Sequence, residues 1–291
     1  MATTHLPHSL LPKSHNTPHR LLILQFQTSH LTKSHLKLQL TLTQTTNWTI
    51  TRIELHSKTS TYAALDLQEA ITNFIRSSPD PQEKFIIYYG GCAFIEETDF
   101  QWRWHPTPDF WGSEAERVRY CEGHTARVDP AVALETLIHG TGDRDLLFIF
   151  HCPFETASTT FQHTLPRTPG RNIQLLLLPQ QTSAPVPESG TCMRQTCMNP
   201  TLDTGKGWNH DLDDQGLEAL RKCLEKRFQG ELEEERKFSL QSLFYSLPGE
   251  GYRNAVLMSI MGEAKNFILT KGTVLEGKKM DEEEKEGVMM S

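Results

Sequence analysis

The sequence predicts an α/β protein in which a mostly parallel central sheet is flanked by helices. Apolar runs that suit buried strands alternate with amphipathic stretches that suit helices along the chain. The runs at 85–89, 146–150 and 173–178 are almost uninterrupted, as strands covered on both faces are. Strand and helix alternating in this way predict a sheet with a helical layer on each side.

The first half of the chain supplies three predicted strands and two helices. The strands are expected at 21–26, 48–55 and 84–89, with β-branched residues dominant in the second. Between them, helices are expected at 30–47 and 61–78, where leucines and other apolar residues recur at helical spacing.

The second half predicts further elements of both kinds. A helix is expected at 129–140, with Asp129 as its N-cap and Gly140 near its end. Strands follow at 145–150 and 172–179. We then expect helices at 211–228 and 237–248, and closing strands at 254–261 and 266–270. The aromatic segment 95–127 is predicted to be irregular, either as a packed loop or as an exposed contact surface.

Composition indicates the domain limits and argues against a nucleic-acid-binding or membrane-spanning protein. Residues 1–19 are predicted to be a disordered lead-in, 20–271 one domain with a polar insert at about 180–211, and 272–291 a disordered charged tail. A net charge of −7 gives no basic footprint for nucleic acid, and no apolar segment approaches the length of a membrane span. Without a recognisable signal peptide, we expect a cytoplasmic protein with reduced cysteines.

No cofactor or metal site is predicted. Cys192 and Cys197 stand four residues apart in the polar insert, a spacing that fits no common pair of zinc ligands. A Rossmann-like nucleotide binder was a further possibility, but it needs a glycine turn after the first strand. The stretch QFQTSHLTKS has no glycine, so this alternative is weak.

Two strand ends carry the residues of greatest chemical interest. Gly90, Gly91 and Cys92 follow one apolar strand, and His151, Cys152 and Pro153 end another. In parallel sheets, the carboxyl ends of the strands are where ligands bind. These two ends are therefore the predicted site.

The order of elements and these turns together resemble the caspase-like cysteine peptidases, particularly the metacaspase-related domains. In that family one strand ends in a Tyr-Tyr-Gly-Gly-His-Gly-like turn that carries the catalytic histidine. After a helix, a second strand runs into an Asp-Cys-Cys-Phe-like turn that carries the nucleophile. FIIYYGGCAF is similar to the first, and HCPFE is similar to the second. The resemblance spans roughly residues 20–271 and implies a caspase-like fold.

The chemical positions of the family are replaced in this chain. Cys92 stands where the resemblance expects the catalytic histidine, and Pro153 stands where it expects the nucleophilic cysteine. His151 replaces the aspartate that helps to form an acidic pocket for a basic substrate side chain. The resemblance therefore implies a pseudo-peptidase that acts by binding proteins, possible partners being active caspase-like paralogues or signalling assemblies.

An active enzyme remains the alternative. A cysteine-type endopeptidase needs a thiolate and a nearby base. Cys152 is the fallback nucleophile, although it lies one residue early and a one-residue shift in a strand reverses the face. Cys92 with His151 as its base is the other arrangement that the two strand ends allow.

Overall fold

A mostly parallel six-stranded sheet forms the centre of the protein. The structure, a computed structural model, describes residues 18–27, 32–95, 102–106, 126–152, 171–179, 210–230, 237–247 and 255–271. The sheet order is β2-β1-β3-β6-β7-β9, and every neighbouring pair is parallel except β7 and β9. These strands are β2 (Thr49–Leu55), β1 (His19–Phe26), β3 (Lys84–Gly90), β6 (Leu146–Cys152), β7 (Ile173–Pro179) and β9 (Val256–Met261). The predicted α/β class is confirmed.

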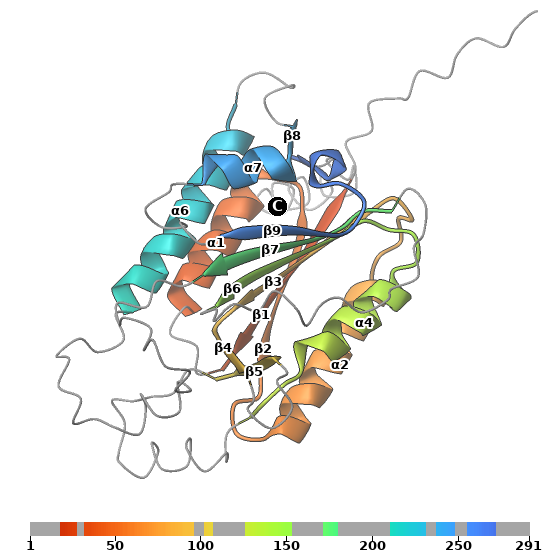
Figure 1. The fold of residues 1–291 in the computed structure, drawn as a ribbon, viewed down its shortest axis with the longest axis vertical. Coiled ribbons are helices and arrows are strands. Elements are labelled where there is room, and N and C mark those ends of the chain that lie inside the picture. Colours follow the sequence, from red (N-terminus) through yellow and green to blue (C-terminus); the bar gives the residue numbers. More distant parts are fainter. Residues whose placement is uncertain are drawn as a thin grey trace, which may run out of the picture.

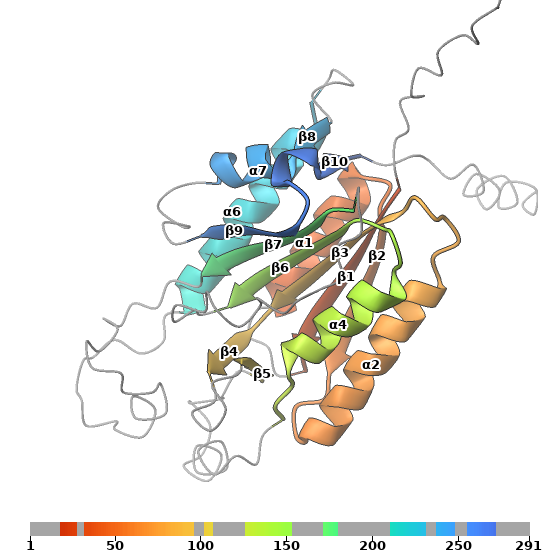
Figure 2. The same cartoon turned by 45° about the vertical axis from the view of Figure 1, so that its right-hand side comes forward.

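Helices cover both faces of this sheet (Figures 1 and 2). On one face lie α1 (Thr32–Thr45), α6 (His210–Phe228) and the short α7 (Leu240–Ser246); on the other lie α2 (Ser60–Arg76) and α4 (Pro130–Gly140). None of the described helices combines the length and apolar character that crossing a membrane requires.

Local sequence explains where α2 and α4 begin. The side chain of Thr59 accepts a hydrogen bond from the backbone N–H of Tyr62 at the start of α2. Asp129, the predicted N-cap, accepts one from Ala131 N–H at 2.8 Å, and Pro130 occupies the first turn of α4. Both caps satisfy backbone donors that a helix start leaves unpaired.

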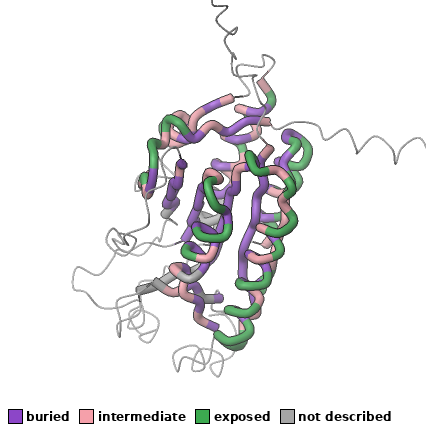
Figure 3. Tube along the Cα trace, turned by 90° about the vertical axis from the view of Figure 1, so that its right-hand side faces the viewer, coloured by how far each residue is buried: buried purple, intermediate pink, exposed green. Residues whose placement is uncertain are grey.

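Alternation along the strands divides the core into two apolar clusters. In β6, Phe148 and Phe150 face α2 and α4, whereas Leu147 and Ile149 face α1 and α6. The central strands β1, β3 and β6 are buried along almost their whole length, and the helices alternate between buried and exposed residues (Figure 3). This pattern explains why the strand sequences are apolar without interruption.

A small antiparallel hairpin begins just before the predicted irregular segment 95–127 and extends into it. Its strands are β4 (Cys92–Ile95) and β5 (Trp102–His105). Trp104 is 1% exposed, stacks on Tyr89 with ring centroids 4.0 Å apart and packs edge-on against Phe150. The expectation of an exposed contact surface is therefore wrong at Trp104, because this ring completes the core. Residues 96–101 and 107–125 lie outside the described residues.

The C-terminal elements also differ from the prediction. The first residues of the expected helix 237–248 form a strand, β8 (Lys237–Ser239), which pairs with β10 (Ile268–Thr270). A short 3₁₀ turn, Ala264–Asn266, precedes β10. Only β9 joins the central sheet, so the two predicted closing strands belong to different sheets.

Most of the predicted flanks and insert lie outside the described residues. These parts are 1–17, 180–209 and 272–291. At the boundaries, His19 already belongs to β1, and His210 and Asp211 begin α6.

Candidate functional site

The two strand ends singled out by the sequence lie side by side. β3 and β6 are neighbours, and Gly90 pairs in register with His151. One residue further on, the backbone N–H of Gly91 donates to the carbonyl oxygen of His151 at 3.2 Å. The chain therefore leaves both strands from adjacent points on the carboxyl edge of the sheet, where parallel sheets place their sites.

Cys92 and Pro153 follow these strand ends directly. Cys92 is the first residue of β4, and the backbone register of the hairpin places it opposite His105. The sequence had given no reason to connect Cys92 with His105, because ten or more residues separate them and no motif spacing links them. Pro153 lies outside the described residues.

His151 is enclosed on the α1 and α6 face of the sheet. His151 is only 1% exposed, and its Nδ1 forms a hydrogen bond of 3.1 Å with the hydroxyl of Tyr88. Both residues are in neighbouring strands and on the same face. A buried imidazole with a hydroxyl partner is stabilised in place, because a buried polar group without a partner costs free energy.

Cys152 lies on the opposite face. It is fully buried and belongs to the apolar cluster beneath α2 and α4. The alternation of strand side chains thus separates the Cys152 thiol from the His151 imidazole, although the two residues are adjacent in sequence.

A buried polar cluster, which the sequence analysis missed, adjoins His151. It consists of Gln25, His35, Tyr88 and His151, each 1% exposed or less. Gln25 Oε1 and His35 Nδ1 are hydrogen-bonded, and His35 meets Tyr88 edge-on with ring centroids 5.4 Å apart. The signal in the sequence was Gln25 itself, a polar residue inside the apolar run LLILQF.

The remaining contacts of Gln25 connect this cluster to neighbouring elements. Its Nε2 donates to Thr32 Oγ1 at 3.2 Å, at the start of α1, and to Glu54 Oε1 at 3.3 Å, in β2. One amide therefore links three elements at the carboxyl edge. Such a network holds the first turn of α1 against the sheet and fixes the relative positions of β1, β2 and α1 at the carboxyl edge.

Gly90 allows the His35 ring to approach the sheet. A Cβ atom at this position would collide with His35 Nε2 and would lie 2.9 Å from Tyr88 Cε1. The glycine of the family-like turn is therefore required here by packing, because the imidazole occupies the space that a side chain would need.

Two basic groups whose pKa is shifted by burial, Lys84 and Arg171, lie at the other end of the sheet. Desolvation by burial lowers the pKa of Lys84, although Asp145, with its carboxylate 3.6 Å from Nζ, opposes the shift. Burial likewise lowers the pKa of Arg171, whose guanidinium donates to the carbonyls of Ile138 and Arg144. These cations fasten the strand starts to α4 and β10, a structural role.

Metal binding finds no support in the described ranges. Within them, no three histidine, cysteine, aspartate or glutamate side chains lie together as a metal ion would need. The carboxyl edge carries a hydrogen-bonded pair, Tyr88 and His151, at two strand ends that lie side by side.

No protein-family model matches the chain, and no curated protein is similar to it at a significant level.

Proposed function

We propose that this chain is a catalytically inactive caspase-like protein that acts by binding other proteins. The observation that carries the proposal is the pairing of Gly90 with His151, which brings together, at one edge of a mostly parallel sheet, the two strand ends that precede the family-like sequence motifs. A scaffold arranged in this way retains the place of a catalytic dyad. The residues at that place, Cys92 and Pro153, are not the histidine and cysteine that the chemistry needs.

The surroundings of the strand ends also support an inactive protein. His151 is buried and hydrogen-bonded to Tyr88, and Cys152 faces the other side of the sheet. A dyad needs its thiol and its base within hydrogen-bond reach. Neither the geometry of His151 nor that of Cys152 suits general-base or nucleophilic work on a substrate at the surface.

The second candidate is an active cysteine-type endopeptidase that uses Cys152, or Cys92 with His151. The observation in its favour is the closeness of the two strand ends, since the backbone of Gly91, next to Cys92, is hydrogen-bonded to that of His151. The loss of the pocket aspartate at position 151 argues against a preference for basic substrates.

A peptidase assay separates these candidates. The wild type is incubated with Arg-, Lys- and Asp-terminated fluorogenic peptides, with and without calcium, beside Cys92→Ala, Cys152→Ala and the double variant Cys92→His/Pro153→Cys. We expect no turnover by the wild type and measurable turnover by the double variant, because the latter restores the dyad at adjacent turns. Wild-type turnover that disappears on replacing one cysteine would instead establish the endopeptidase.

A labelling experiment provides a second measure. A thiol-directed peptide inhibitor is added to the folded protein, and the modified cysteine is located by mass spectrometry. Cys223 on α6 is only partly buried and serves as the internal control for non-specific alkylation. Stoichiometric labelling at Cys92 or Cys152 in preference to Cys223 would contradict an inactive protein.

A further inference from the structure

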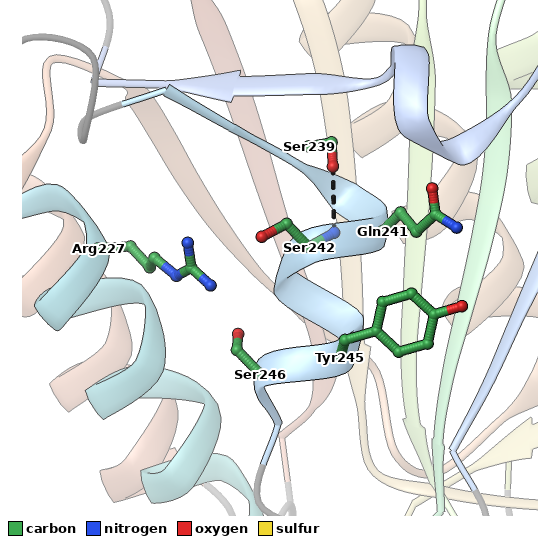
Figure 4. Close-up of a pocket in the computed structure, with 6 residues that line it drawn as sticks. All are labelled: Arg227, Ser239, Gln241, Ser242, Tyr245 and Ser246. Carbon is green, nitrogen blue, oxygen red and sulfur yellow. Dashed lines mark hydrogen bonds between the residues drawn. The ribbon is translucent and has the colours of Figure 1, made fainter.

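A polar hollow lies between the end of α6 and the exposed side of α7 (Figure 4). Its volume is about 440 Å³. No acidic residue is among its lining residues, which are Arg227, Ser239, Gln241, Ser242, Tyr245 and Ser246. The hollow is separate from the carboxyl edge, because Phe228 in the last turn of α6 packs against Trp48, just before the start of β2, and against Phe238 of β8.

Arg227 is held in this hollow without a counter-ion among the described residues. Its guanidinium carbon lies 5.6 Å from the centre of the Phe238 ring, a cation–π contact that orients the side chain. No carboxylate of the described part of the chain comes within ion-pairing distance of Arg227. Arg221, nearly two turns earlier, is different, since Glu218 and Glu225 lie 2.6 and 2.8 Å from its guanidinium.

Hydroxyl groups face this guanidinium from α7. Ser242 and Ser246, one turn apart, point toward Arg227, whereas Gln241 and Tyr245 extend from the other side of the helix (Figure 4). Ser246 Oγ donates to the carbonyl of Leu243 at 2.8 Å. Ser239 Oγ accepts from the backbone N–H of Ser242 at 3.1 Å and caps the start of α7. Because the Ser246 hydroxyl already donates to Leu243, the Ser242 hydroxyl is the donor most available to a ligand.

A guanidinium opposite hydroxyl donors suits an oxyanion. Arginine presents a planar fork that binds two oxygens of one phosphate or carboxylate, and a serine hydroxyl can donate to a third oxygen. A phosphate monoester offers three such oxygens and, near neutral pH, close to two negative charges. The open shape of the hollow leaves room for the group that carries the phosphate.

We propose that the hollow formed by Arg227, Ser242 and Ser246 binds a phosphate monoester. Two features limit the affinity. The carboxyl end of α6 carries partial negative charge, and the whole chain has a net charge of −7. The segment joining α6 to β8 is also rich in glutamate, at positions 231, 233, 234 and 235. The site is independent of the proposed pseudo-peptidase function, which concerns the opposite edge of the sheet.

The test is a titration of the isotopically labelled full-length protein, followed by NMR at the Nε–Hε resonance of Arg227. The probes are a blocked phosphoserine peptide, its unphosphorylated form and adenosine monophosphate. We expect the phosphorylated probes to bind with a Kd of about 1 mM. Tighter binding of the peptide would identify a phosphorylated protein segment as the source of the phosphate, and tighter binding of the nucleotide would identify a small ligand.

Matched variants distinguish the site from general charge attraction, with binding followed by calorimetry. Arg227→Gln is expected to weaken phosphopeptide binding about tenfold, because charge-assisted hydrogen bonds are lost. Ser242→Ala should weaken it by a smaller factor. Lys226→Gln removes the same charge from the neighbouring exposed residue, and Arg76→Gln removes it from α2. Both controls should bind like the wild type.

Two results would overturn the proposal. One is equal weakening by Arg227→Gln and Lys226→Gln, which would mean that only the local charge matters. The other is the absence of any response to either phosphorylated probe at ten times the expected Kd. Thermal unfolding of each variant establishes that it is folded, and the wild-type titration tests the site without any substitution.

Discussion

The two faces of the central sheet are built on different principles. Beneath α2 and α4, the side chains of β3 and β6 are apolar from the start of each strand to its end, with Cys152 as the last. Beneath α1 and α6, the same strands end in Tyr88 and His151, which form a buried polar cluster with Gln25 of β1 and His35 of α1. One face is packed mainly from apolar side chains, whereas the other encloses hydrogen-bonded groups at the edge where sites occur.

The contrast shows how sequence neighbours acquire different roles. His151 and Cys152 are consecutive, yet strand alternation gives His151 to the polar cluster and Cys152 to the apolar face. In the sequence, His151 and Cys152 belong to one short motif, HCPFE, and are predicted to share one turn. The structure separates them by the thickness of the sheet, and this separation is what makes a dyad of His151 and Cys152 unworkable.

The largest expected effect comes from filling the space beside Gly90. Gly90→Ala should lower the free energy of unfolding by about 1–3 kcal/mol, because the new methyl group meets the rings of His35 and Tyr88. Chemical denaturation measures the change. Gly140→Ala is the control, since its methyl group would meet only the flexible end of Ile75 and alanine favours the helix. Equal destabilisation by both would argue against the tight approach of His35.

A smaller effect is expected from removing one hydroxyl of the polar cluster. Tyr88→Phe deletes the hydrogen bond to His151 and should cost about 1 kcal/mol of unfolding free energy. Tyr62→Phe, at an exposed position on α2, removes the same atom and should change stability little. If the two variants were equally stable, the Tyr88–His151 bond would contribute nothing to the difference between the faces.

The smallest effect concerns Lys84, which marks the amino edge. Burial lowers its pKa, so between that lowered value and its usual value the unfolded chain binds a proton that the folded chain does not. The free energy of unfolding therefore rises with pH in this window. Below the window, the buried ammonium of Lys84 is charged in the folded chain, and it then destabilises the fold most. The stability of the wild type relative to Lys84→Met should increase as pH rises toward about 10.

A second variant tests the cause of that slope. Asp145 raises the pKa of Lys84, in opposition to burial. Asp145→Asn should therefore move the lower limit of the window, the folded-state pKa of Lys84, to lower pH. Denaturation midpoints measured across alkaline pH give the answer, and a difference between wild type and Lys84→Met that falls with pH would contradict the assigned direction.

Much of the fold followed from the sequence because the controlling signals are local. Uninterrupted apolar runs predicted β3, β6 and β7, and the Asp129 cap located the start of α4. Local signals failed where pairing depends on distant residues. Lys237 to Ser239 form a strand because β10 lies beside them. β4 and β5 form a hairpin that no turn motif in the sequence predicted.

The candidate site divides in the same way. The sequence alone determined that Cys92, His151, Cys152 and Pro153 come at the ends of two apolar runs, since chain order and apolar patterning are local properties. Only the tertiary structure decided that Gly90 pairs with His151, that Tyr88 and His35 surround it, and that Cys152 faces away. Strand order and the packing of α1 bring together residues more than 100 positions apart in the chain, from Gln25 to His151, and no local pattern encodes contacts at that separation.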